Sequence, residues 1–188
     1  MQRSIDNKAS GRGGESMGVR KLFSEVEIAE MVDGLAGQIR RDYQGRNPLL
    51  VGCLTGSFVF MSDLVRRIAI PLECDFMKVS SYEDRMTAGE IKLLLDVTLP
   101  VAGRDVIVVD DIVDTGQSLS FICDRLKSKG SKSLTTCVLL YKESERQTIP
   151  KEKIEYLGFT VPDVFIVGYG IDCAHRHREL PYIGAVTT

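Results

Sequence analysis

Features that would place this 188-residue chain in several familiar classes are missing from its sequence. No apolar run approaches the ~18–20 residues that a membrane-spanning helix needs. The net charge is only −2, so the chain has no overall basic field that would recruit nucleic acid. None of the five cysteines belongs to a C-x-x-C pair, and most lie in apolar surroundings, which favours buried thiols in a reducing compartment over disulfides or a zinc site. We therefore expect a globular protein of the cytoplasm.

The length is that of one domain with a single core of ordinary size. Residues 1–18 are polar, include the run GRGGES and contain no hydrophobic segment. We interpret them as a disordered leader and residues 19–188 as the domain. Ser24 and Glu27 fit a capping box, and apolar residues recur at helical spacing directly after it, which predicts the first helix of the domain.

The most informative stretch is residues 106–129, VIVVDDIVDTGQSLSFICDRLKSK. It opens with four β-branched apolar residues, a pattern typical of a strand buried on both faces of a parallel sheet. Asp110, Asp111 and Asp114 follow at once, before a helical pattern begins. Asp is common in turns and at helix N-termini, so a single one would indicate no ligand. Three within five residues, directly after a buried strand, favour a binding site.

The loop between this strand and the helix combines two kinds of chemistry. Free main-chain N–H groups and two hydroxyls in residues 115–118 lie at a helix start, which favours a phosphate, and Gly116 lets the backbone approach it closely. Carboxylates beside a phosphate would repel it unless a divalent cation or sugar hydroxyls lie between them. No G-x-x-x-x-G-K motif occurs, which excludes a Walker A loop. The pattern therefore predicts a ligand with the shape of a ribose 5-phosphate.

A second strand, predicted at residues 49–54, runs into Thr55-Gly56-Ser57 and a helix over residues 58–68. This loop could bind another anion or be a plain strand-to-helix turn, and the pattern alone favours neither. Strands and helices alternate in this way over residues 49–140, which predicts the crossover units of an α/β fold.

A polar stretch over residues 80–89 separates strands predicted at 72–79 and 91–97. It is longer than a hairpin needs and is typical of a lid. Lys142 ends another strand, predicted at residues 134–141. A lysine in such a position is usually just solvated, but ligands of open α/β sheets bind at the carboxyl ends of the strands.

Three segments carry a family resemblance. VVDDIVDTGQS resembles the ribose-phosphate loop of the type I phosphoribosyltransferases, which has two acidic residues followed by D-T/S-G-x-S/T. CLTGSFVFMSDLVRR is similar to the pyrophosphate loop of that family, and VPDVFIVGYGIDCAHRHRELPYIG resembles its C-terminal segment almost position for position. Over residues 20–186 the chain most resembles the bacterial hypoxanthine (hypoxanthine-guanine) phosphoribosyltransferases. The resemblance implies a central parallel sheet flanked by helices, with a small hood built from the N- and C-terminal segments.

The resemblance also implies an activity in purine salvage. A Mg²⁺-dependent enzyme of this kind transfers the 5-phosphoribosyl group from 5-phosphoribosyl 1-pyrophosphate to N9 of hypoxanthine and guanine, and releases IMP or GMP with pyrophosphate. Asp114 would be the general base that takes the proton from N7 of the purine, and Lys142 would contact the 6-oxo group. Asp110 and Asp111 would hold the ribose hydroxyls and the waters of the metal, and Asp172 a second metal ion. By analogy with the family, the protein would be a homodimer or homotetramer.

The remaining roles follow from the same match. Phe165 would stack on the purine, Ile166 would offer its main chain to the base, and Arg178 would reach the pyrophosphate. Ser81 and Tyr82 would begin the lid, and the peptide bond between residues 54 and 55 would be cis. The substrate-contacting set that the resemblance implies is Leu54, Thr55, Gly56, Ser57, Ser81, Tyr82, Asp110, Asp111, Ile112, Asp114, Thr115, Gly116, Gln117, Ser118, Lys142, Phe165, Ile166 and Arg178.

Three alternatives stay open. His175 and His177 could form a transition-metal site with Asp172, although no further ligand is evident, so solvated loop histidines are favoured. The enzyme could prefer xanthine or guanine. The chain could also be a non-catalytic regulator that senses nucleotide and binds nucleic acid, but such a protein usually has a basic stripe. The spread of lysine and arginine along the chain and the presence of Asp114 favour catalysis.

Overall fold

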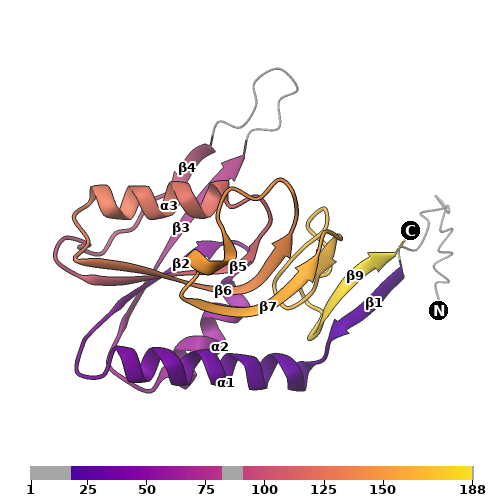
Figure 1. Ribbon diagram of the computed structural model, residues 1–188, viewed down its shortest axis with the longest axis horizontal. Coiled ribbons are helices and arrows are strands. Elements are labelled where there is room, and N and C mark those ends of the chain that lie inside the picture. Colours follow the sequence, from indigo (N-terminus) through magenta and orange to yellow (C-terminus); the bar gives the residue numbers. More distant parts are fainter. Residues whose placement is uncertain (1–17, 82–90, 188) are drawn as a thin grey trace, which may run out of the picture.

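A six-stranded sheet forms the centre of the protein in a computed structural model that describes residues 18–81 and 91–187 (Figure 1). The strand order is β4-β3-β2-β5-β6-β7. All neighbours pair in parallel except β3 and β4, where the edge strand β4 is antiparallel. The prediction of an α/β fold with a central, mostly parallel sheet is confirmed. The strands are β2 (Leu49–Leu54), β3 (Glu73–Ser81), β4 (Ile91–Leu95), β5 (Asp105–Val113), β6 (Ser133–Glu143) and β7 (Tyr156–Pro162).

Helices cover both faces of this sheet (Figure 1). The helices α1 (Glu25–Asp42) and α2 (Phe58–Ile68) lie on one face, α3 (Gln117–Ser128) lies on the other, and a short 3₁₀ helix, η1 (Lys151–Lys153), precedes β7. In β5, Ile107 and Val109 belong to the core under α1 and α2, whereas Val106 and Val108 belong to the core under α3. Alternate residues of a strand point to opposite faces, so the β-branched run fills both cores at once.

The first helix begins as predicted. The Ser24 hydroxyl accepts a hydrogen bond from the Glu27 N–H (3.3 Å), and the Glu27 carboxylate accepts one from the Ser24 N–H (2.8 Å), which completes the capping box. The apolar face that follows is buried in the core from Ile28 to Ile39. The helix α2 spans the residues predicted for it, 58–68.

A second, three-stranded antiparallel sheet forms the hood, in the order β1-β9-β8. Its strands are β1 (Gly18–Phe23), β8 (Ile166–Val167) and β9 (Ile183–Thr187), so the two ends of the chain meet in it as expected. Gly18, interpreted as the last residue of a leader, is the first residue of β1. Residues 1–17 lie outside the described part of the chain.

Residues 82–89 of the predicted lid, with Tyr82 among them, also lie outside the described residues. Ser81 ends β3, and the strand expected over residues 91–97 is shorter, because β4 ends at Leu95. In residues 18–81 and 91–187, no helix combines the length and the apolar character needed to cross a membrane.

Candidate active site

Most of the predicted site residues gather where strands β2, β5, β6 and β7 end. From β2 the chain continues outward to β3 and β4, whereas from β5 it continues the other way to β6 and β7. The gap between the ends of β2 and β5 is therefore a topological switch point, where ligands of open α/β sheets bind. The loops that follow these strands, residues 55–57, 114–116 and 144–150, surround this position together with the hood segment.

Asp110 and Asp111 are consecutive residues of β5, so their side chains point to opposite faces of the sheet. Both are only 8% exposed. Asp110 lines a small cavity of about 100 Å³ together with the loop that leads into α3. The Asp111 carboxylate lies against Gly56, where a Cβ atom would come within 2.1 Å of it. Gly56 is therefore required for the close approach of this loop to β5, a reason for this residue that the sequence pattern did not reveal.

Burial raises the pKa of both carboxyl groups. The pKa of Asp110 lies well above its usual range because of desolvation and the neighbouring charge of Asp111. Desolvation raises the pKa of Asp111 to about 7, a rise that the Arg178 guanidinium opposes and the Asp172 carboxylate supports. Two adjacent buried carboxyl groups with raised pKa values are typical of a functional site.

The free energy of unfolding of the ligand-free protein is expected to depend on pH through Asp111. Its pKa is about 7 in the folded protein and about 3.9 in an unfolded chain, so the folded state binds the proton more tightly. The free energy of unfolding should therefore fall as the pH rises from about 4 through about 7, and this fall ends above the folded pKa. The difference corresponds to ~4 kcal/mol at most.

The substitution Asp111→Asn removes this titrating group with little change in shape. The variant should gain stability relative to the wild type as the pH rises from 4 to 8, which urea-induced unfolding at a series of pH values would measure. Asp124→Asn, on the exposed surface of α3, is the matched control and should follow the wild type. A difference between Asp111→Asn and the wild type that stays constant over this pH range would contradict the expectation.

The loop from Asp114 to Ser118 has the form expected of a phosphate site. Gly116 is the N-cap of α3 and has φ = +82°, a backbone conformation that glycine adopts without strain. The cavity beside Asp110 is lined by the predicted residues Ile112, Asp114, Thr115, Gly116 and Ser118, which the fold thus brings together. Gln117 is the first residue of α3, and its N–H donates to the Thr115 hydroxyl at 3.4 Å.

Four charged side chains meet at the ends of β6 and β7. Lys142 is only 6% exposed, and its Nζ lies 3.2 Å from Oδ2 of Asp114 and 3.6 Å from Oδ1 of Asp163. Arg146 Nη2 approaches the same two carboxylates at 3.4 Å and 3.1 Å. Sequence reasoning did not identify Arg146 or Asp163 as site residues. Asp163 directly follows Pro162 at the end of β7, beside β6. Ligands of open α/β sheets bind at the carboxyl ends of strands, so this position could have indicated Asp163.

Phe165 lies just beyond this cluster and is 75% exposed, an unusual degree of exposure for an aromatic side chain. Ile166, the next residue, is buried at the start of β8. Its side chain packs in the core, so only its main chain can face a ligand. The stacking role of Phe165 and the main-chain role of Ile166 stay predictions.

The loop after β2 has a cis peptide bond between Leu54 and Thr55, as expected from the resemblance. Ser57, also expected to contact substrate, is fully buried, and its hydroxyl donates to the Cys53 carbonyl at 2.7 Å. The Ser57 side chain therefore holds the turn from β2 into α2, and its hydroxyl does not face the site.

Arg178 joins the acidic centre to the hood. Its Nη2 lies 2.6 Å from Oδ1 of Asp172, and its Nη1 donates to the Gly170 carbonyl at 2.6 Å. The other oxygen of Asp172 accepts the His175 N–H at 2.8 Å. The His175 side chain itself is 97% exposed, which agrees with a solvated loop histidine.

The acidic residues suit a hard divalent cation. Within the described ranges, no three His, Cys, Asp or Glu side chains could enclose a metal ion by themselves. Mg²⁺ does not need such a cage, since it usually takes one or two carboxylates and completes its shell with waters and substrate phosphates. The buried carboxylate of Asp111, with Asp172 near enough to affect its pKa, fits that pattern. The predicted set of Asp110, Asp111 and Asp172 stays a prediction.

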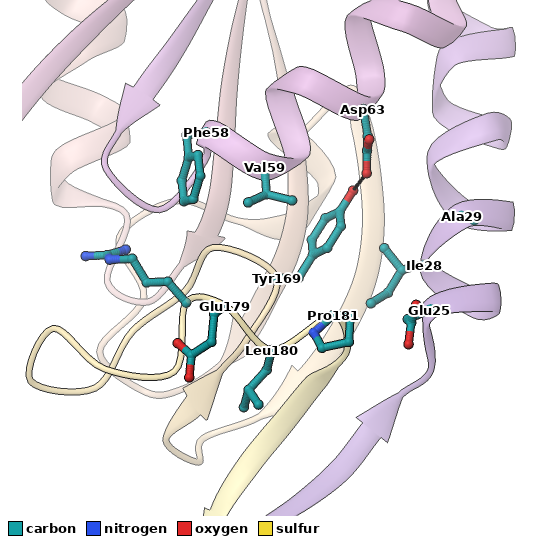
Figure 2. A pocket seen from close by; sticks show the side chains of 11 residues that line it. Glu25, Ile28, Ala29, Phe58, Val59, Asp63, Tyr169, Glu179, Leu180 and Pro181 are labelled. Atoms are coloured by element: carbon teal, nitrogen blue, oxygen red, sulfur yellow. Dashed lines mark hydrogen bonds between the residues drawn. The ribbon is translucent and has the colours of Figure 1, made fainter. Parts of the chain in front are cut away.

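A larger cavity of about 590 Å³ borders this site (Figure 2). It lies between the first turns of α1 and α2 and the hood, and it shares Arg178 with the site described above. Tyr169 points into it and donates a hydrogen bond to Asp63 at 2.6 Å (Figure 2). Apart from Arg178, the predicted site residues do not line it.

Comparison with known proteins agrees with this geometry. The sequence model of the phosphoribosyl transferase domain matches residues 19–173. The bifunctional protein TilS/HprT of Listeria monocytogenes is 44% identical over 176 residues, which are 92% of this chain but only 27% of that protein. This chain thus spans about a quarter of such relatives. The hypoxanthine-guanine phosphoribosyltransferase of Bacillus subtilis is 42% identical and is covered over 91% of its length by 88% of this chain.

Solved structures show the same likeness. The crystal structure of a hypoxanthine-guanine phosphoribosyltransferase from Bacillus anthracis, with a HEPES molecule in its active site, superposes with a TM-score of 0.84 at 43% identity. The match covers 92% of this chain and 100% of that one.

Proposed function

The chain belongs to the phosphoribosyl transferase family, and from that premise we propose that it is a purine-salvage enzyme acting on hypoxanthine and guanine. It transfers the 5-phosphoribosyl group of 5-phosphoribosyl 1-pyrophosphate to N9 of the base. The bond between C1′ and the pyrophosphate oxygen breaks, the bond between N9 and C1′ forms, and the proton on N7 leaves the base. The products are the purine nucleotide and pyrophosphate.

The observation that carries this proposal is the pairing of Asp114 with Lys142 at 3.2 Å, at the edge of the phosphate loop. Lys142 is a buried donor suited to the 6-oxo group of the purine, and Asp114 beside it is a proton acceptor suited to N7. The 6-oxo oxygen and N7 are neighbours on one edge of the purine, so a base stacked on Phe165 can contact Lys142 and Asp114 at the same time. The neighbouring loop supplies main-chain donors for the 5-phosphate.

The opposite end of the site handles the departing pyrophosphate. Asp111 and Asp172 would hold Mg²⁺, which would supply charge neutralisation for the leaving polyanion, and Asp110 would face the ribose. The loop at Thr55 and Gly56 brings main-chain groups to this end, and the Arg178 guanidinium adds a positive charge there. Asp110 lines the cavity beside the phosphate loop, which supports a role of its carboxylate toward the ribose hydroxyls.

A spectrophotometric assay tests the proposal directly. The protein, 5-phosphoribosyl pyrophosphate and Mg²⁺ would be combined with hypoxanthine, guanine, xanthine, adenine or orotate in turn. We expect rapid turnover of the 6-oxopurines hypoxanthine and guanine, none of orotate, and loss of activity when EDTA removes the metal. Binding of the donor without turnover of any base would contradict the proposal and would support a non-catalytic sensor.

Two further properties belong to the same proposal. The enzyme works in the cytoplasm, where its substrates are small molecules and its thiols stay reduced. It assembles as a homodimer or homotetramer, in line with its family. Sedimentation velocity at micromolar concentration would measure the assembly, and a monomer that is fully active would contradict it.

A further inference from the structure

One segment beside the site has no role in the proposed function. It consists of residues 147–149, in the connection between β6 and η1, and we call it the brace. Within the brace, the side-chain amide of Gln147 contacts the main chain at the start of the phosphate loop. Its Nε2 donates to the main-chain oxygens of Val113 (2.9 Å) and Asp114 (2.5 Å).

Thr148, the next residue of the brace, contacts the next residue of the phosphate loop. Its N–H and its hydroxyl both donate to the Thr115 carbonyl, at 2.8 Å and 2.7 Å. Ile149 then packs against Gly116, where a Cβ atom would come within 2.9 Å of its side chain. The brace thus follows the phosphate loop residue by residue.

The hydrogen bonds of the brace determine which way the loop peptides face. In a trans peptide group, the C=O and the N–H of the next residue point in opposite directions. The brace holds three consecutive carbonyls, those of residues 113–115, so the N–H groups of residues 114–116 point away from it. The cavity beside Asp110 is lined by residues of the loop and its flanks and by none of the brace, so it does not lie on the side that the brace occupies.

The Gln147 side chain is held by its nitrogen alone. Its Nε2 also donates to the Lys142 carbonyl at 2.8 Å. Three main-chain carbonyls thus surround the two hydrogens of the amide nitrogen. Its Oε1 is buried and has no hydrogen-bond partner in the part of the chain that the structure describes. Leaving a buried acceptor unpaired lowers stability. The amide therefore keeps this orientation because of the three carbonyls, and it joins the phosphate loop to the main chain of the base-recognising lysine.

We propose that Gln147 and Thr148 are positioning residues that hold the main-chain donors of residues 114–116 toward the 5-phosphate of the donor and of the product. This inference rests on the proposed function and adds residues that the family resemblance did not identify. Without the brace, the loop carbonyls are free to turn, and the array of N–H donors is no longer directed at one anion.

The test compares ligands with and without a 5-phosphate. Gln147→Met keeps the size of the side chain and removes its donors, and Gln38→Met is the same change on the exposed surface of α1. Isothermal titration calorimetry with Mg²⁺ would measure the Kd of guanosine 5′-monophosphate, ribose 5-phosphate and pyrophosphate. In Gln147→Met we expect about tenfold weaker binding of the first two and pyrophosphate binding within twofold of the wild type. Gln38→Met should bind all three normally.

A second variant keeps the test decisive if Gln147→Met does not fold. Thr148→Val removes only the hydroxyl donor and keeps the main-chain bond, so guanosine 5′-monophosphate and ribose 5-phosphate should bind about threefold more weakly and pyrophosphate normally. Unchanged binding, or an equal loss for all three ligands, would overturn the inference and leave the proposed function standing. A wild-type protein that binds neither guanosine 5′-monophosphate nor ribose 5-phosphate would overturn both.

Discussion

Replacing Asp114 with asparagine is expected to lower kcat for hypoxanthine at least ~10²-fold, because a positioned general base typically contributes ~10²–10⁴-fold. An amide cannot take the proton that N7 loses as N9 attacks C1′. It can still accept a hydrogen bond from Lys142, which lies 3.2 Å from the Asp114 carboxylate, so the local geometry should persist. The Kd of 5-phosphoribosyl pyrophosphate, measured by calorimetry with Mg²⁺, should change by less than about threefold.

The neighbouring carboxylate provides a matched control. Asp163 contacts the same two cations, Lys142 and Arg146, and is about as exposed as Asp114. Asp163→Asn therefore makes the same chemical change with the same partners, but it removes no general base. Its kcat should fall less than tenfold. Equal losses in the two variants, or near-normal turnover by Asp114→Asn, would show that proton transfer does not depend on Asp114.

The parts of the fold that follow from local pattern could be predicted from the sequence. The β-branched run of β5 fills two cores, the capping box starts α1, and α2 occupies the residues predicted for it. Each of these features depends on neighbouring residues only. The strand β1 could not be predicted in this way, because it is held by pairing with β9 at the other end of the chain.

In the candidate site too, local sequence pattern indicated some residues and missed others. Asp110, Asp111, Asp114 and Gly116 lie within seven residues of the sequence, so their pattern indicated a ribose-phosphate loop. Arg146 and Gln147 reach the site from an irregular connection whose path depends on tertiary packing, and no periodic pattern marks it. For Ser57, the motif gave the position correctly but did not show that its hydroxyl bonds to the Cys53 carbonyl within the turn.

Replacing Lys142 with methionine is expected to have the largest effect on the choice of base. Lys142 is buried, and in the wild type its ammonium group would donate to a 6-oxo oxygen but would oppose the 6-amino group of adenine. A site built around a hydrogen bond rejects the analogue that leaves its polar group unpaired by as much as ~10⁴–10⁵-fold. Lys142→Met should lose at least ~10²-fold in kcat/KM for hypoxanthine, and most of the discrimination against adenine should disappear with it.

A variant of Arg146 is the control that distinguishes the loss of a positive charge from the loss of base recognition. It contacts the same carboxylates as Lys142 but is largely exposed, so Arg146→Met removes a positive charge without removing the buried donor. Its kcat/KM for hypoxanthine should fall less than tenfold, and its preference for hypoxanthine over adenine should remain. Steady-state kinetics with both bases would measure the two ratios. If Lys142→Met keeps the preference while Arg146→Met loses it, the base is recognised from the exposed side of the cluster, and the role assigned to Lys142 is wrong.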